Sequence, residues 1–76
     1  MDLSSAFALV LKKHRLARNL SQAALAKQAG LHQTAIGFLE RAERSPSIDT
    51  LEAISKALKT SVSELMVEAE KVQSRS

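Results

Sequence analysis

The sequence predicts a single all-α domain built from five short helices. Apolar residues recur at helical spacing along the chain, and no segment alternates apolar and polar residues as a half-buried strand does. The 76 residues are enough for one domain and too few for two. Hydrophobic residues make up 45% and aromatic residues only 3%, so the core must be largely aliphatic. We expect the compact domain to span residues 1–72 and the end, 73–76, to be a disordered tail.

The first two helices are indicated by their apolar spacing and their end residues. The first should cover about Ser4–Arg18 and end at Asn19, because asparagine tolerates the left-handed conformation that often ends a helix. The second should cover Gln22–Ala29, with Ser21 as its N-cap and Gly30 as its end. On the inward face of the first helix we expect Leu3, Phe7, Val10, Leu11 and either His14 or Ala17.

Three further helices follow. The third should cover about His32–Arg41, and residues 42–47, which contain the only proline, should form a loop. Ser47 or Asp49 is expected to cap the fourth helix, and Ser61-Val62-Ser63-Glu64 has the form of a capping box at the start of the fifth. The fourth helix should bury Leu51, Ile54 and Leu58.

Composition and charge exclude several classes of protein. The absence of cysteine excludes a disulfide-stapled secreted module and a thiolate metal site, and suits a cytoplasmic protein. The apolar run 6–11 is followed rather than preceded by cations, unlike a signal peptide, and no stretch is long enough to span a membrane. The net charge of +3 is uneven, with +4 in residues 1–44 and −1 in residues 45–76. The first half therefore suits a polyanionic partner.

Residues 20–40 carry the functional motif. Two short helices meet at Gly30, and Ala26 is small enough to let them approach closely. Their shared seam is expected to contain Leu25, Leu31, Ile36 and Leu39. The opposite side of the third helix then presents Gln33, Thr34, Gly37, Phe38 and Arg41. Uncharged groups flanked by cations suit the reading of base edges in DNA, with the cations on phosphates.

The segment LSQAALAKQAGLHQTAIGFLER resembles the helix-turn-helix of phage repressor and Cro proteins, the XRE-type regulators. The resemblance extends over residues 7–66 and includes PSIDTLEAISKAL and SVSELM. In size and layout the chain is similar to the stand-alone controller proteins of restriction–modification systems. This resemblance implies a five-helix, lambda-repressor-like DNA-binding domain that places residues 32–41 in the major groove of double-stranded DNA.

The resemblance also implies roles for individual residues. Base contacts are implied for Gln33, Thr34, Gly37 and Phe38. Phosphate contacts are implied for Ser21, Gln22, His32, Arg41 and Arg44. An internal salt bridge is implied between Arg15 and Glu40. The chain departs from the family pattern at Asn19 and Ala42, where glycine is frequent, and at His32, which replaces a common capping Ser or Thr.

Each of these roles has a plainer alternative. Gln33 and Thr34 could be ordinary exposed residues. Gly37 costs about 1 kcal/mol relative to alanine inside a helix, which favours close approach to DNA over sequence drift. For Phe38, contact with a thymine methyl and cover for the rim of the core are equally supported. The cations Lys12, Lys13 and Arg18 fit a solvated face better than specific contacts.

The fifth helix carries an apolar stripe that suggests a dimer. The stripe consists of Val62, Leu65, Met66, Ala69 and Val72. Because a domain this small hardly needs three turns of core at its end, we expect Leu65, Met66 and Ala69 to form a two-fold interface. The alternative is that the whole stripe packs within one chain. A two-fold dimer would bind a pseudo-palindromic operator.

These observations predict a sequence-specific transcription regulator that acts as a homodimer and is controlled by its own concentration, as in an autoregulated switch. The alternative is an antitoxin or bridging factor whose main partner is a protein. An enzyme is disfavoured, because no cluster of acid, base and nucleophile is recognisable. We expect no catalytic residues, no metal, no cofactor and no small-molecule ligand.

Overall fold

Most helices in this chain begin where a side-chain oxygen accepts a hydrogen bond from a free backbone N–H. Ser21 Oγ accepts from the N–H of Ala24 at 3.0 Å, and Ser47 and Ser61 cap their helices in the same way. This confirms Ser21 as the N-cap of the second helix and shows that Ser47, not Asp49, caps the fourth. The first helix is capped by Asp2, whose Oδ1 accepts from the N–H of Ser5 at 2.8 Å, so it begins one residue earlier than expected.

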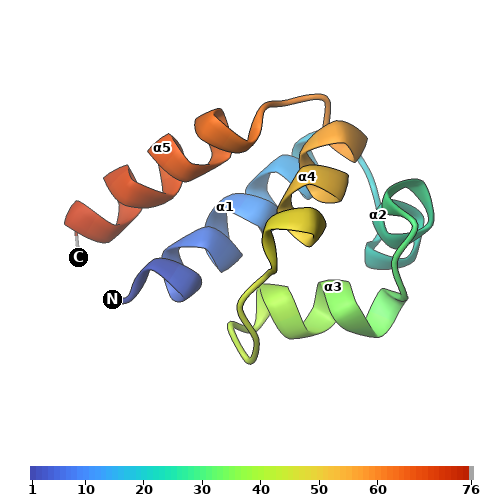
Figure 1. Ribbon diagram of the computed structural model, residues 1–76, viewed down its shortest axis with the longest axis horizontal. Helices are drawn as coiled ribbons and strands as arrows, with labels where there is room; N and C mark the ends of the chain where they lie inside the picture. The colour runs from blue at the N-terminus through green and yellow to red at the C-terminus, as the bar shows by residue number, and fades with distance from the viewer. Residues whose placement is uncertain (76) are drawn as a thin grey trace.

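The computed structural model describes residues 1–75, and within them the chain forms five helices and no strand (Figure 1). The fold class expected from the sequence is therefore confirmed. No helix in this part of the chain is long and apolar enough to cross a membrane. The helices are α1 (Leu3–Ala17), α2 (Gln22–Ala29), α3 (Gln33–Glu40), α4 (Ile48–Ala57) and α5 (Val62–Ser74).

The helices are separated by tight turns in the left-handed conformation. Gly30 adopts a φ of 70°, and Asn19, Ala42 and Lys59 adopt φ values of 56–57°. Asn19 and Ala42 therefore take the conformation of the glycines that are frequent at these positions in the XRE-type pattern. For Ala42 this conformation costs about 1–2 kcal/mol, because its Cβ crowds the following carbonyl oxygen.

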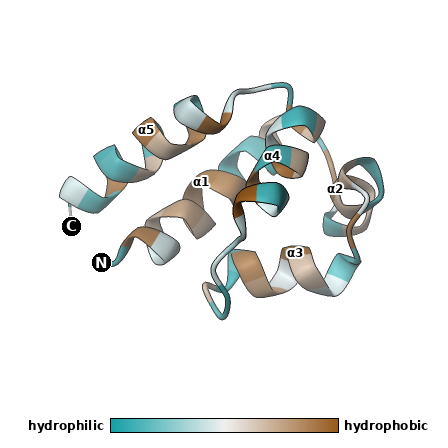
Figure 2. Cartoon of the chain, viewed as in Figure 1, coloured by the Kyte–Doolittle hydropathy of each residue, from teal (hydrophilic) through white to brown (hydrophobic). Residues whose placement is uncertain are grey.

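α1 lies at the centre of the fold, packed against α3 on one side and α5 on the other, while α2 packs against α3 and α4 (Figure 1). Figure 2 shows that α5 alternates between hydrophobic and hydrophilic residues, as an amphipathic helix does. The largest fully buried side chains are Val10, Leu11, Leu25, Ile36, Ile54, Leu58 and Leu65. On α1 the expected inward face is wrong at Leu3, which is exposed, and of the two candidates at the other end His14 is partly buried and Ala17 exposed.

The structure corrects two expectations about α5. Leu65 and Ala69 are completely buried against the core of their own chain, and Met66 is half-buried beside them. Leu65 and Ala69 therefore have no surface to offer a second protomer, because α5 packs them into the core of its own chain, against α1 and α4. The helix also continues through Ser74, so residues 73 and 74 are helical rather than part of a disordered tail. Ser76, the end of that expected tail, lies outside the described residues.

Candidate nucleic-acid interface

The turn between α2 and α3 fixes the angle between the two helices. The N–H of Leu31 donates to the carbonyl of Ala26 at 2.8 Å, across the left-handed Gly30. This hydrogen bond satisfies a carbonyl at the end of α2 and reverses the chain within three residues. Ala26 is almost completely buried and Ile36 completely so, so the two helices meet along a dry seam. The orientation of α3 is consequently rigid.

The first turn of α3 presents its side chains to solvent. His32, Gln33 and Thr34 are exposed, and the side chains of Gln33 and Thr34 form no hydrogen bond with any of residues 1–75. His32 is the N-cap but makes no capping hydrogen bond with its side chain, as the sequence suggested. Backbone N–H groups at this end of α3 and the two free side chains are therefore available to a ligand.

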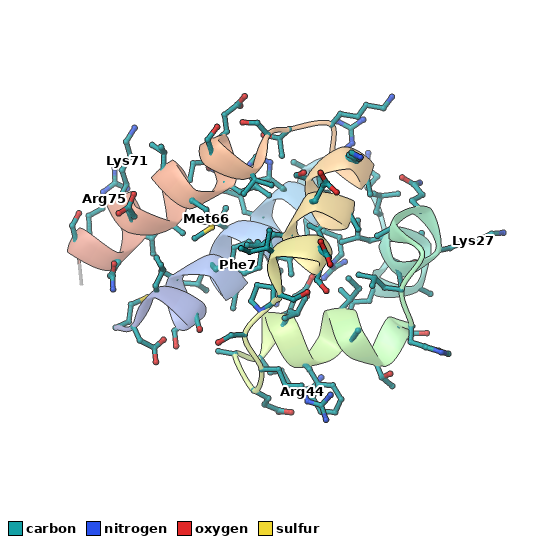
Figure 3. All side chains as sticks on the ribbon, viewed as in Figure 1. Phe7, Lys27, Arg44, Met66, Lys71 and Arg75 are labelled. Carbon is teal, nitrogen blue, oxygen red and sulfur yellow. The ribbon has the colours of Figure 1, made fainter. Side chains whose placement is uncertain are left out.

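At the other end of α3, Phe38 supports two guanidinium groups. The Cζ of Arg44 lies 4.3 Å from the centroid of the Phe38 ring and that of Arg41 lies 5.5 Å away. Figure 3 shows Arg44 on the side of α3 that faces away from α5. A cation over an aromatic face is held by the ring quadrupole. Phe38 therefore positions cations, a role that neither of the two interpretations from the sequence included.

Arg41 also forms an ion pair with a neighbour on the loop. Its Nε donates to Glu43 Oε2 at 2.8 Å and its Nη2 to Oε1 at 3.4 Å. The hydrogen bonds from Arg41 lower the pKa of Glu43 and raise that of Arg41. Both side chains are about half exposed. Arg44 forms no ion pair with residues 1–75, but its charge, with that of Arg41, helps to lower the pKa of Glu43.

Gly37 is buried beneath Arg41. A Cβ at this position would lie 2.9 Å from Nη1 of Arg41, so the guanidinium occupies the space that a side chain would need. Arg41 covers Gly37 in this conformation, and the base contact expected for Gly37 stays a prediction. The atom concerned is the far end of a flexible and half-exposed side chain, so this contact does not by itself explain the glycine.

A buried ion pair ties α3 to α1. Arg15 Nε donates to Glu40 Oε2 at 2.6 Å and its Nη2 to Oε1 at 3.0 Å, while Nη1 donates to the carbonyl of Leu20 at 2.8 Å. The side chains are only 9% and 4% exposed, and the hydrogen bond to Glu40 raises the pKa of Arg15. The Arg15–Glu40 pair expected from the resemblance is present.

Gln22 belongs to the same network. Its Nε2 donates to Glu40 Oε1 at 3.1 Å, and the side chain is partly buried. The sequence had placed this side chain on the DNA backbone, and it missed the partner within the protein. Ser21, which precedes it, is exposed and uses its Oγ as the acceptor of the α2 cap. Its hydroxyl proton remains able to reach a phosphate.

Two short helices joined by a glycine turn, the second exposing polar side chains beside arginines, define a helix-turn-helix DNA-binding protein. The chain belongs to the helix-turn-helix family HTH_3, whose profile matches residues 11–65. It is a DNA-binding regulator of the XRE type.

Comparison with individual proteins narrows this class. The chain is 44% identical over 66 residues to the control protein C.SmaI of Serratia marcescens, a match covering 87% of this chain and 79% of that protein. It is 43% identical over 53 residues to the control protein C.BamHI of Bacillus amyloliquefaciens, covering 68% and 65%. The fold matches the wild-type restriction-modification controller protein C.Esp1396I with a TM-score of 0.89 and 32% identity, over all of this chain and 99% of that one. These relatives are regulatory proteins rather than enzymes.

Proposed function

We propose that this protein is the controller of a restriction–modification system, which binds a pseudo-palindromic operator as a homodimer and regulates transcription from it. The observation that carries the proposal is the first turn of α3, where Gln33 and Thr34 are exposed and uncommitted on a helix whose opposite face is fully buried. The similarity to C.SmaI and C.BamHI supports the controller role over that of an antitoxin.

In this proposal the side chains of α3 read the bases. The amide of Gln33 can accept and donate at once, which suits the N6 and N7 edge of adenine, and Thr34 offers a hydroxyl and a methyl group. Both side chains lie on the first turn, the part of a recognition helix that enters the major groove in this class of protein. Gly37 would come close to the bases once Arg41 moves off it, as it would on exchanging Glu43 for a phosphate.

Phosphate contacts would come from groups around this helix. Arg44 lies over the ring of Phe38 without an ion-pair partner, and Arg41 would exchange Glu43 for a phosphate. Ser21 and His32 lie exposed at the starts of α2 and α3, where free N–H groups also favour an anion. Gln22 would hold Glu40 with one amide N–H, and its second N–H could still reach a phosphate.

The dimer needs a surface other than the buried stripe of α5. Ile48, at the start of α4, is 82% exposed. A hollow of about 180 Å³ lies at the start of α1, and it is lined by Leu3, Ser4, Phe7, Ser45, Pro46, Leu51 and Met66. We assign this surface to the second protomer, since an aliphatic side chain left in water beside an apolar hollow is stabilised by mutual burial. Of the three interface residues expected from the sequence, only Met66 remains.

The experiment is selection from a random duplex pool with the purified protein, followed by sequencing and titration of the enriched DNA at two salt concentrations. The proposal expects a pseudo-palindrome whose half-sites are roughly one helical turn, about 34 Å, apart. Sedimentation of the complex should give two protein chains per duplex. A pool that stays random, with binding that is weak and only salt-dependent, would overturn sequence reading.

The interface has its own test. Ile48→Glu should give a folded monomer that binds one half-site and no longer prefers the full palindrome. Val67→Glu, which changes an exposed residue of α5, should remain dimeric. A dimeric Ile48→Glu variant would refute this assignment of the interface without affecting the DNA-binding proposal.

A further inference from the structure

An open groove runs between α1 and α5, on the side of the molecule away from α3. It has a volume of about 340 Å³ and is lined by Leu9, Val10, Lys13, Glu68, Lys71, Val72 and Arg75. Figure 1 shows α5 and α3 on opposite sides of α1, and Figure 3 places Lys71 and Arg75 far from Arg44. DNA bound to α3 would therefore leave this groove uncovered.

The floor of the groove is apolar. Leu9 is 52% exposed, and the next residue of α1, Val10, is buried in the core. Val72 is half-buried on the facing side of α5. An exposed leucine alone is ordinary on a protein surface, but here it adjoins other aliphatic side chains at the bottom of a groove. Burial of this surface by a partner would be favourable.

The rim of the groove is cationic. It carries three cations and one carboxylate, a net charge of +2. Glu68 is already used, because Lys13 Nζ donates to its Oε1 at 3.0 Å and Nε2 of His14 lies 2.7 Å from its Oε2. Neither Lys71 nor Arg75 forms an ion pair within the described residues 1–75. These two charges are left for an external anion, although residues 45–76 as a whole are slightly acidic.

We propose that the α1/α5 groove binds an acidic amphipathic segment of a partner protein. Aliphatic side chains of the partner would pack against Leu9 and Val72, and its carboxylates would pair with Lys71 and Arg75. Charge complementarity selects this occupant. A second copy of the chain would bring the same cations to face each other, and nucleic acid has no aliphatic surface to place on the floor. The inference goes beyond the proposed function, because it gives the DNA-bound protein a separate surface for recruiting another protein.

The test uses a designed peptide of roughly 18 residues, long enough to form a helix on its own, built from Glu, Leu and Ala with leucines along one face. Two control peptides replace all Glu by Lys or all Leu by Ser. Each peptide is titrated into the ¹⁵N-labelled full chain, and affinity is measured in parallel by fluorescence anisotropy at two salt concentrations. The acidic peptide should shift the amide signals around Leu9, Lys13, Lys71 and Val72, and binding should weaken with salt.

Variants locate the contact. Lys71→Glu combined with Arg75→Glu should weaken the acidic peptide roughly tenfold or more, because like charges then face each other. Lys27→Glu combined with Lys59→Glu changes the net charge equally at exposed positions outside the groove and should leave the affinity unchanged. Leu9→Ser should weaken the peptide while leaving binding to duplex DNA unaltered.

Several outcomes would overturn the proposal. One is that the Lys peptide or the Ser peptide binds as tightly as the acidic peptide. Another is that amide signals shift only in α2 and α3. A third is displacement of the peptide by duplex DNA, which would place the peptide on the DNA-binding surface. Shifts of the groove signals on dilution of the protein alone would assign the groove to a second copy instead. None of these results bears on operator selection, so the two proposals fail independently.

Discussion

Removal of the Glu40 carboxylate should strongly destabilise the domain. In Glu40→Ala, Arg15 would keep the carbonyl of Leu20 as an acceptor but lose both carboxylate oxygens, and the Gln22 amide would lose its partner. The Arg15 side chain is only 9% exposed, so water cannot replace these acceptors without local opening. Breaking a buried pair by removing one partner costs about 3–5 kcal/mol. For a domain of this size, whose total stability is roughly 4–11 kcal/mol, that is a large fraction.

Urea unfolding followed by far-UV circular dichroism measures this loss, and thermal unfolding should show a fall in Tm of about 12–40 °C. The variant Arg15→Met combined with Glu40→Leu replaces both charges by apolar groups of similar size and should recover most of the stability. Glu43→Ala breaks the exposed pair with Arg41 and should leave the urea midpoint unchanged. A loss below about 1 kcal/mol for Glu40→Ala would refute the view that this pair clamps α3 to α1.

Three other predictions follow from single features. Ala42→Gly should raise the free energy of unfolding by about 1 kcal/mol, because glycine adopts the observed φ of 57° without strain; a lower urea midpoint would contradict this. Gln33→Ala should weaken the selected operator by about 1–3 kcal/mol and random duplex little, whereas Arg44→Ala should weaken both alike; equal losses for Gln33→Ala would exclude base reading. Hydrogen bonds from α1 lower the pKa of Glu68 below its usual 4.5, so its stabilising contribution is complete above that pH and is lost as the pH falls through the lowered pKa. Unfolding measured from pH 6 to pH 2 should therefore show a shallower acid loss for Glu68→Gln than for the parent.

Local signals were sufficient to predict much of the fold. Ser21, Ser47 and Ser61 each precede an amphipathic segment, and a cap involves only neighbours in sequence. No cap was predicted for the first helix, and its start was placed at Ser4, one residue after the start that the Asp2 cap defines. Such an ambiguity shifts a boundary without altering the helix.

Side-chain partners were harder to predict, because they depend on which helices meet. The stripe on α5 showed that one face is buried but not what buries it, and the core of the same chain rather than a second protomer covers Leu65 and Ala69. Likewise, the hydrogen bond from the Gln22 amide to Glu40, which joins α2 to α3, was not predicted. No pattern along the sequence shows how close the Gln22 amide lies to the Glu40 carboxylate.

The two ends of the proposed DNA surface are therefore held in different ways. The first turn of α3, with Gln33, is held by the glycine turn and by the buried seam, so in the proposed function its side chains would meet a base edge with little loss of backbone entropy. The cations at the other end rest on Phe38, and Arg41 is held by an exposed ion pair that a phosphate can replace. A fixed helix turn for base contacts beside adjustable arginines would suit a protein that moves along DNA through phosphate contacts and stops only where the bases match.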